Sequence, residues 1–344
     1  MEDLMEPIWI DSTSTESVRE VLALCGILQE DEQISELSSA GEGNMNIALR
    51  ANISGASGSR SIIVKQARPY VAKYRQIPAP IERVAFESAF YDFVEDDEVL
   101  AKRMPQRLTS NSDHFLLALE DLGPAADATS WYQATPSNIV GQVTELLDWL
   151  FVLHQTSRGK IDKHRFGNHE LRALNHAHIF DLPFRDPAAT DLGQFCVGLS
   201  EASLEVRSDQ ALRGAALKLG ECYLGSGHCL LHGDYYPGSW LVSGAMPMVI
   251  DPEFCFAGPC EFDLGIMLGH LQLIGHLEAS QTFEQQIEMH NTSANIVDLD
   301  LMHRFAAVEV LRRLLGVAQL PLGEMSLDRR MELITNASDT LKDH

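Results

Sequence analysis

Two segments decide the fold of this chain: Leu230-Leu231-His232-Gly233-Asp234-Tyr235-Tyr236-Pro237-Gly238-Ser239-Trp240 and, shortly after it, Val249-Ile250-Asp251-Pro252-Glu253-Phe254. One carboxylate, Asp234, follows an apolar strand, and two more, Asp251 and Glu253, come seventeen and nineteen residues later. Short apolar runs at residues 240–242 and 248–250 flank a Ser-Gly turn and predict a β-hairpin, which brings these carboxylates to the same end of neighbouring strands. Because Mg²⁺ binds carboxylate oxygen and keeps substrate phosphates as ligands, the two segments predict a magnesium site.

The spacing of these residues is typical of kinases, in which an H-x-D motif is followed by an asparagine and then by a second acidic motif. Here Ser239 stands at the asparagine position and Asp251 at that of the metal-loop aspartate. We expect Asp234 to accept the proton of the acceptor hydroxyl, Asp251 to bind Mg²⁺ directly, and Glu253 to bind a second ion or a water of the first. Ser239 is a weaker metal ligand that could act through water. His232 is expected to brace the loop and to transfer no proton.

The composition excludes several classes of partner. The 344 residues carry a formal charge of -23 and are 45% hydrophobic and 22% charged. Nucleic-acid binding needs clustered Lys and Arg, and anionic membranes repel such a charge, so we expect neither as a partner. We find no run of about 18 apolar residues and no signal peptide. Six cysteines without a C-x-x-C pair are typical of reduced thiols, so we expect a cytoplasmic protein.

A strand-rich first part precedes a mainly helical second part. In the first part, the patterns predict strands at residues 34–37, 47–53, 61–66 and 115–119 and a helix at 81–93. In the second, they predict long helices at residues 138–157, 205–224 and 298–320. We therefore predict an α+β, two-lobed protein-kinase-like fold. A small antiparallel β-sheet N-lobe, residues 1–122, binds nucleotide phosphates, and a larger helical C-lobe, residues 123–344, carries the catalytic and acceptor sites, with the nucleotide in the cleft.

A glycine-rich turn lies between the first two predicted strands, at Gly41-Glu42-Gly43-Asn44-Met45-Asn46. Two glycines separated by one residue let backbone amides approach a phosphate without a side chain in the way. Asn46 replaces the third glycine of the usual kinase loop. The candidate nucleotide contacts are Gly41, Gly43, Asn44 and Asn46, and a plain hairpin turn is the alternative.

A lysine, Lys65, lies on the following strand, where kinases keep a lysine for the α- and β-phosphates. An ordinary solvent-exposed lysine is the alternative. Its partner is expected to be an acid of the next helix, where Glu82 and Glu87 are available and Glu87 lies inside the helical pattern. Glu120-Asp121-Leu122 falls where a linker strand offers backbone groups to adenine, so Glu120 and Leu122 are further candidate nucleotide contacts.

Three charged residues of the second part have both a structural and a functional interpretation. Asp263 is expected to cap a helix or to orient the metal loop. Arg312 and Arg313 lie inside an apolar helix, where two adjacent arginines are not expected to share one face. Their stems could cover apolar surface, or their guanidinium groups could bind sugar hydroxyls or a phosphate.

Together these residues resemble the methylthioribose kinase branch of the aminoglycoside phosphotransferase and choline kinase group. The resemblance implies ATP- and Mg²⁺-dependent phosphorylation of the anomeric hydroxyl of 5-methylthioribose, in methionine salvage, by a homodimer. It carries over Asp234 as the base, Asp251 and Glu253 as metal ligands, Lys65 as the phosphate lysine, and the arginine pair in the sugar pocket. It spans nearly the whole chain and includes Gly41-Glu42-Gly43-Asn44-Met45-Asn46, Val64-Lys65-Gln66-Ala67-Arg68-Pro69-Tyr70-Val71, Leu174-Asn175-His176, Ile179-Phe180, Gly258-Pro259, Phe262-Asp263 and Arg312-Arg313.

The loop after Asp234 departs from the family pattern, which reads H-G-D-L-H-T-G-S. This chain has Tyr235-Tyr236-Pro237 there, which stiffens the loop and alters the acceptor side of the pocket, with Tyr235 as a candidate acceptor contact. The spacing from Asp234 to Ser239 is kept, so phosphoryl transfer is still expected. The alternatives are a kinase of another small acceptor, of the amino-sugar, choline or homoserine type, and a catalytically silent nucleotide-binding regulatory module.

Overall fold

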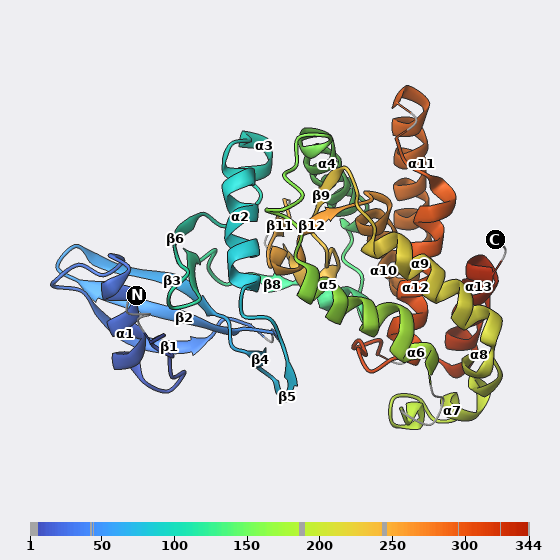
Figure 1. Cartoon of the computed structure of the whole chain (residues 1–344), viewed down its shortest axis with the longest axis horizontal. Helices are drawn as coiled ribbons and strands as arrows, with labels where there is room; N and C mark the ends of the chain where they lie inside the picture. Colours follow the sequence, from blue (N-terminus) through green and yellow to red (C-terminus); the bar gives the residue numbers. More distant parts are fainter. Residues whose placement is uncertain are drawn as a thin grey trace. The chain divides into compact units, whose positions relative to one another are not determined.

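The computed structural model describes residues 6–41, 43, 45–185, 190–242, 246–294, 296–323 and 325–342. The chain divides into two compact units, Met1–Pro124 and Ala125–His344 (Figure 1). Strands dominate the first unit and helices the second, as the hydrophobic patterns predict. Within the described ranges, no helix combines the length and the apolar character needed to cross a bilayer.

The first unit is built on a five-stranded antiparallel sheet in the order β1-β2-β3-β7-β6. Side chains of a strand alternate between its two faces, and Ile62 and Val64 of β3 are buried in the core. Helix α1 (Thr15–Leu24) contributes Val18 and Leu22 to the same core. The strands are β1 (Gln33–Ser39), β2 (Ile47–Gly55), β3 (Gly58–Gln66), β6 (Arg107–Asn111) and β7 (Leu116–Glu120).

Helix α2 (Arg83–Glu95) carries an acid on its buried face. Glu87, Phe90 and Val94 are buried and recur at i, i+3 and i+7, which is the spacing of one helix face. The carboxylate of Glu87 therefore points into the protein and needs a partner there. The hairpin of β4 (Tyr70–Val71) and β5 (Tyr74–Pro78) precedes α2, and the short α3 (Glu98–Ala101) follows it.

The second unit contains the predicted hairpin. β10 (Trp240–Val242) pairs with β11 (Met248–Val249) in antiparallel register, and the turn predicted at Ser243-Gly244 lies outside the described residues. β10 also pairs with β8 (Ala126–Asp127), and β9 (Cys229–Leu231) pairs with β12 (Phe256–Gly258). The second pairing brings the strand that leads into the Asp234 loop (residues 232–239) beside the strand that follows the second acidic segment.

Helices form most of the second unit (Figure 1). The helix predicted at residues 138–157 is α4 (Ile139–Ser157). The one predicted at 205–224 is divided, because the Asp209 side chain caps a separate helix, α9 (Gln210–Leu224). The one predicted at 298–320 ends earlier, as α12 (Leu299–Leu315), where Gly316 is extended.

The other described helices of this unit are α5 (His169–His176), α6 (Leu182–Arg185), α7 (Leu199–Ala202), α8 (Leu204–Ser208), α10 (Glu261–Ile274), α11 (Leu277–Ala294) and α13 (Leu327–Lys342). Short 3₁₀ or π turns occur at Ala128–Tyr132, Ala177–Asp181, Leu192–Gln194, Pro237–Ser239 and Pro252–Phe254.

Two glycines let α10 approach α12 closely. A Cβ at Gly265 would lie 2.6 Å from the Cβ of Phe305, and a Cβ at Gly269 would lie 2.8 Å from the Ala306 carbonyl oxygen. The two glycines are four residues apart, so they share the face of α10 that meets α12. Because α10 is buried along nearly its whole length, this contact fixes the position of α12 within the unit.

Substitution of Gly265 by alanine is expected to destabilise the protein by about 1–3 kcal/mol, because extra volume in a packed core forces backbone shifts. Gly214→Ala in α9 is the matched control: a Cβ there meets no atom within 4 Å, and alanine favours a helix by about 1 kcal/mol over glycine. Chemical denaturation measures both. An unchanged midpoint for the Gly265 variant would contradict the close contact of α10 and α12.

Candidate functional site

A buried carboxylate, Asp263, holds the backbone of the Asp234 loop. Its Oδ2 accepts a hydrogen bond from the N–H of His232 (2.8 Å), and its Oδ1 accepts one from the N–H of Gly233 (3.0 Å). Asp263 lies in the first turn of α10 and has no exposed surface. The N-cap of α10 is Cys260, so the expectation that Asp263 caps a helix is wrong, while the alternative, that it orients the metal loop, stays a prediction. It fixes the loop that carries Asp234.

Helix α4 supports the same loop. The Nε2 atom of His154 lies 3.2 Å from Oδ2 of Asp263. The hydroxyl of Ser157 accepts a hydrogen bond from the N–H of Leu230 (2.9 Å), at the centre of β9. The position of the loop is therefore set by side chains from two helices that are far apart in the sequence.

The ring of His232 braces the loop, as predicted. Its Nε2–H donates to the carbonyl oxygen of Ile250 (2.9 Å), and its Nδ1 accepts from the N–H of Asp234 (3.4 Å). Burial lowers the pKa of His232, so the ring is neutral near pH 7. Because both ring nitrogens are engaged within the protein, this histidine holds the loop and does not exchange a proton with a substrate.

Backbone contacts join the Asp234 loop to the second acidic segment. Gly233 has a φ of 85°, and a Cβ there would lie 2.1 Å from the Phe254 carbonyl oxygen, so this position requires glycine. Asp251 has a φ of 61°, a left-handed conformation that residues with a side chain rarely adopt. Such conformations persist only where the surrounding structure enforces them, and they cluster at functional sites.

The donors near Asp234 fit a magnesium ion. Burial is the largest influence on the pKa of His232 and on that of Tyr236. The charges of Asp234 and Asp251 also act on both pKa values, so the two carboxylates lie near the same two rings. Glu253 is buried two residues further on. Within the described ranges, no group of three or more His, Cys, Asp or Glu side chains could hold a metal alone. Mg²⁺ binds through one or two carboxylates and keeps waters and phosphates, so Asp251 and Glu253 remain candidate ligands for it.

Ser239 has a structural contact in the loop. Its hydroxyl donates to the carbonyl oxygen of Asp234 (2.8 Å), and its N–H donates to the carbonyl oxygen of Tyr236 (2.8 Å). The side chain is buried. These bonds hold the turn closed behind Asp234, and the role of Ser239 as a metal ligand stays a prediction.

Burial and nearby charges have opposing effects on the pKa of the Asp234 carboxyl group. Burial raises its pKa above that of an ordinary aspartate, while Arg313 and Arg312 lower it by favouring the charged form. A carboxylate that is partly removed from water and whose charge is supported by nearby arginines is suited to accept a proton.

The two arginines share one buried acceptor, Glu309. Nη1 of Arg312 donates to Oε2 of Glu309 (3.0 Å), and Nε of Arg313 donates to Oε1 (2.5 Å). The expectation that adjacent arginines cannot share a helix face is wrong here, because Glu309 precedes them by three and four residues and each arginine takes one oxygen. Glu309 has no exposed surface, and both guanidinium groups are nearly buried.

Hydrogen bonds extend this cluster to two other elements. Nε2 of His270, in α10, lies 3.0 Å from Oε1 of Glu309, and the hydroxyl of Tyr132 lies 2.6 Å from Nδ1 of His270. The guanidinium carbon of Arg313 lies 4.9 Å from the ring centre of Tyr236. The sequence predictions missed Glu309, His270, Tyr132 and Tyr236. One signal was available, a single glutamate inside the apolar helical run at 305–311.

Tyr235 is a core residue, so its prediction as an acceptor contact is wrong. Its side chain has no exposed area, and its hydroxyl donates to the carbonyl oxygen of Leu146 (2.8 Å). Its ring stacks on Trp149 at 5.8 Å. Tyr236 is the half-exposed tyrosine of the pair, and it is the one that contacts Arg313.

In the first unit, Lys65 forms a buried ion pair. Its Nζ lies 2.7 Å from Oε1 of Glu87, and both side chains are almost fully buried. Of the two acids available in the sequence, the structure thus selects Glu87. A buried ammonium group held at a fixed place by a carboxylate is not an ordinary surface lysine, and it can bind phosphate oxygens as a point charge.

The glycine-rich turn of the first unit is anchored by Asn46. The side-chain oxygen of Asn46 accepts from Nε of Arg83 (2.8 Å), and Nη2 of Arg83 also donates to the carbonyl oxygen of Met45 (2.9 Å). Gly41 and Gly43 would meet no atom within 4 Å if they carried a Cβ, so no contact of the described chain requires glycine there. Asn44 lies outside the described residues.

The end of β7 is held by Asp121, which the predictions did not single out. Its carboxylate accepts two hydrogen bonds from Arg50 (2.7 and 3.0 Å) and one from Ser61 (2.6 Å). Of its neighbours, Glu120 is exposed and Leu122 is half-buried. Side-chain contacts thus fix the backbone of the segment that was predicted to meet adenine.

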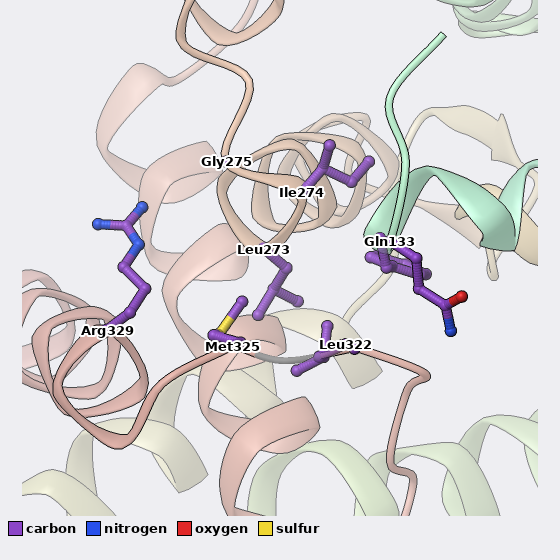
Figure 2. A pocket seen from close by; sticks show the side chains of 9 residues that line it. Gln133, Leu273, Ile274, Gly275, Leu322, Met325 and Arg329 are labelled. Atoms are coloured by element: carbon purple, nitrogen blue, oxygen red, sulfur yellow. The ribbon is translucent and has the colours of Figure 1, made fainter.

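A cavity of about 600 Å³ lies within the second unit, between the end of α10 and the start of α13 (Figure 2). The side chains of Leu273, Leu322 and Met325 approach one another around it (Figure 2). Tyr132 lines this cavity as well as bonding to His270, so the cavity adjoins the Glu309 cluster.

A family profile and two known protein sequences match this chain. Residues 48–289 match the profile of the phosphotransferase enzyme family, which is more than half of the chain. Methylthioribose kinase of Bacillus pumilus is 28% identical over 268 residues, which cover 75% of this chain and 66% of the relative. Methylthioribose kinase of Erwinia tasmaniensis is 31% identical over 250 residues, 67% of this chain and 58% of the relative. The matched part is thus less than two thirds of the length of either relative.

Among solved structures, choline kinase LicA from Streptococcus pneumoniae is similar with a TM-score of 0.53 and 14% identity, covering 96% of this chain and 99% of that chain. At this identity the match concerns the fold alone. It confirms the α+β protein-kinase-like fold, with an antiparallel sheet in the N-terminal part and a larger helical C-terminal part.

Substitution of Asp263 by asparagine is expected to destabilise the protein by about 1–3 kcal/mol, because one of two buried N–H groups loses its acceptor. Asp209→Asn is the matched control, since asparagine caps a helix as well as aspartate does. Thermal denaturation of both variants measures the difference. Equal stability of the two variants would show that the contact of Asp263 with the loop is weak.

Proposed function

Because the chain belongs to the phosphotransferase enzyme family, we propose that it is an ATP- and Mg²⁺-dependent kinase of a small sugar. Its acceptor is 5-methylthioribose, phosphorylated at the anomeric hydroxyl in methionine salvage. The relatives that are methylthioribose kinases support this acceptor. The observation that carries the reaction type is the Asp234 carboxylate, which sits in a loop fixed by Asp263 and near an arginine pair.

Asp234 acts as the general base. The acceptor oxygen bonds to the γ-phosphorus while the bond to the leaving ADP oxygen breaks, and the proton of the acceptor hydroxyl goes to Asp234. The contacts of His232 and Ser239 keep the Asp234 backbone in place, so the carboxylate needs no reorganisation during the reaction. When bound, Mg²⁺ neutralises charge on the transferred phosphates, held by Asp251 and Glu253.

The N-lobe predicted from the sequence, residues 1–122, binds the nucleotide, and the C-lobe, residues 123–344, carries catalysis and acceptor binding. Lys65 binds the α- and β-phosphates, and its ion pair with Glu87 supports this role because it holds the ammonium group in one position. The glycine-rich turn, with Gly41, Gly43, Asn44 and Asn46, contributes backbone amides, and Glu120 and Leu122 offer backbone groups to adenine.

The arginine pair favours a neutral acceptor. Two guanidinium groups share the carboxylate of Glu309 and also act on the carboxylate of Asp234, so the charges of these four side chains balance. An ammonium group of an amino sugar or choline placed against these guanidinium groups would be repelled by them. A sugar supplies several hydroxyl oxygens that accept hydrogen bonds from guanidinium N–H groups. The presence of Lys65, Asp234, Asp251 and Glu253 together speaks against a catalytically silent module. A homodimer and a cytoplasmic location remain predictions of this proposal.

The test is ADP release by the purified protein with ATP and Mg²⁺ against a panel of methylthioribose, other pentoses, choline, homoserine and aminoglycosides. We expect turnover with methylthioribose above all others. Asp234→Asn is expected to lower kcat by about three orders of magnitude or more, because it removes the base and keeps the shape.

Nucleotide affinity of the Asp234→Asn protein, measured by calorimetry, should stay within about threefold of the original, since the base contacts the acceptor. Asp191→Asn, an exposed aspartate of the same unit, is the control and should retain full activity. No ADP release with any acceptor, or faster turnover with choline than with methylthioribose, would reject the proposed function.

Removal of divalent cations with EDTA is expected to abolish turnover, and added Mg²⁺ to restore it. Asp251→Asn should raise the Mg²⁺ concentration for half-maximal activity by about tenfold or more, because a neutral amide is a weaker ligand for a hard cation. The measurement is a magnesium titration at saturating ATP and acceptor. A variant with the original magnesium dependence would remove Asp251 from the metal site.

A further inference from the structure

One buried carboxylate on α12 accepts hydrogen bonds from three side chains. Glu309 has no exposed surface and accepts from Arg312 (3.0 Å), Arg313 (2.5 Å) and His270 (3.0 Å). Burial on its own would raise the pKa of Glu309, but Arg312 and Arg313 outweigh it and hold the pKa well below the usual range. Glu309 is therefore a carboxylate anion, which can only accept hydrogen bonds.

The direction of the whole hydrogen-bond chain follows from that charge. The bond between Glu309 and His270 requires a proton on Nε2 of the histidine. Burial lowers the pKa of His270 to about 4, so near pH 7 its ring carries no second proton. Its Nδ1 is then an acceptor, and the hydroxyl of Tyr132, at 2.6 Å, donates to it. The chain runs Tyr132 to His270 to Glu309, and each donor has its acceptor.

These hydrogen-bonded side chains lie beside the Asp234 loop. The guanidinium group of Arg313 lies 4.9 Å from the ring centre of Tyr236, and the ring of His270 lies 5.3 Å from that ring. Tyr236 is two residues from Asp234 and is half-exposed. Arg312 keeps a buried Nε atom without a hydrogen-bond partner in the protein. Arg313 and His270 thus connect Glu309 to the ring of Tyr236 and so to the loop that carries Asp234.

A contribution to fold stability does not explain why this buried hydrogen-bond chain exists. A buried cluster of charges costs several kcal/mol to desolvate, and apolar residues of the same volume commonly stabilise a fold as well or better. What such a cluster does supply is a fixed position and orientation for its charged groups. The second unit has a large apolar core around α10 and α12, so a charged cluster at this place has a role beyond filling space.

We propose that Glu309, His270 and Tyr132 are positioning residues of the acceptor site, which hold Arg312 and Arg313 in the orientation that binds a neutral polyhydroxyl acceptor beside Asp234. This inference rests on the proposed kinase function and names how that site selects its acceptor. The arginines donate to the acceptor's oxygens, and the three residues behind them act only through the arginines.

Glu309→Gln tests the inference, since it keeps the shape and removes the charge that holds both arginines. We expect kcat/KM for the acceptor to fall by about tenfold or more, mainly through KM, while the KM for ATP changes by less than about twofold. Glu32→Gln is the matched control: Glu32 is also a buried carboxylate paired with an arginine, Arg60, but in the other unit. It should leave the acceptor KM unchanged.

Tyr132→Phe tests the far end of the hydrogen-bond chain and disturbs the fold less than Glu309→Gln, because it removes only one hydroxyl. Its acceptor KM should rise by about fivefold, the effect of one lost hydrogen bond. Tyr223→Phe is its matched control. Tyr223 is also a fully buried tyrosine of this unit, and its hydroxyl accepts from Asn175 and has no part in the chain.

The outcomes distinguish a positioning role of Glu309 and Tyr132 from a purely structural one. A structural role alone would lower the fraction of active enzyme, and with it kcat, but would leave the acceptor KM unchanged; that result overturns the positioning role. If Glu309→Gln does not fold, as circular dichroism would show, an unchanged acceptor KM for Tyr132→Phe overturns it. If the original protein phosphorylates no acceptor on the panel, the proposed function fails first. A selective rise of the acceptor KM in both variants and in neither control supports the inference.

Discussion

The carboxylate of Asp263 is the contact on which the rest of the candidate site depends. It binds two successive backbone N–H groups of the Asp234 loop from inside the protein, where no water can replace it. Its own position comes from α10, which α12 meets closely at Gly265 and Gly269. Asp234, its loop and the arginine pair are therefore placed by one packed assembly of two helices, and a rigid assembly of this kind is what the proposed catalysis requires.

The distribution of charge within this assembly suits the proposed phosphoryl transfer. Asp234 needs to be anionic to take a proton, but burial works against its charge. Arg312 and Arg313 reduce that cost in part, and Glu309 keeps the two like charges at one place despite their mutual repulsion. Without Glu309, the arginines would gain by separating toward water. Glu309 and Asp234 are thus two anions that interact with the same two arginines. A change at Glu309 that moves the arginines would therefore also change the charge environment of Asp234.

The sequence predicted those parts of the site whose signal is local. The hairpin, the bracing role of His232 and the choice of Glu87 in α2 follow from periodicity and spacing over fewer than twenty residues. What it did not predict depends on tertiary contacts. Alternation cannot tell which of Tyr235 and Tyr236 points inward in an irregular loop, and an i, i+3, i+4 set becomes one cluster only where burial forces it together. Tyr132 joins His270 across 138 residues of sequence, which no local pattern shows.

The contacts of the two tyrosines after Asp234 show that the altered loop is compatible with the proposed reaction. Tyr235 fills the core, where its ring stacks on Trp149 and its hydroxyl binds the backbone of α4, so it anchors the loop from within. Tyr236 turns to the other side and places its ring against Arg313. A guanidinium group held over an aromatic face keeps its charge while losing little freedom on binding. The departure from the family pattern therefore changes what supports the arginine, and it leaves the base and its spacing to Ser239 as they were.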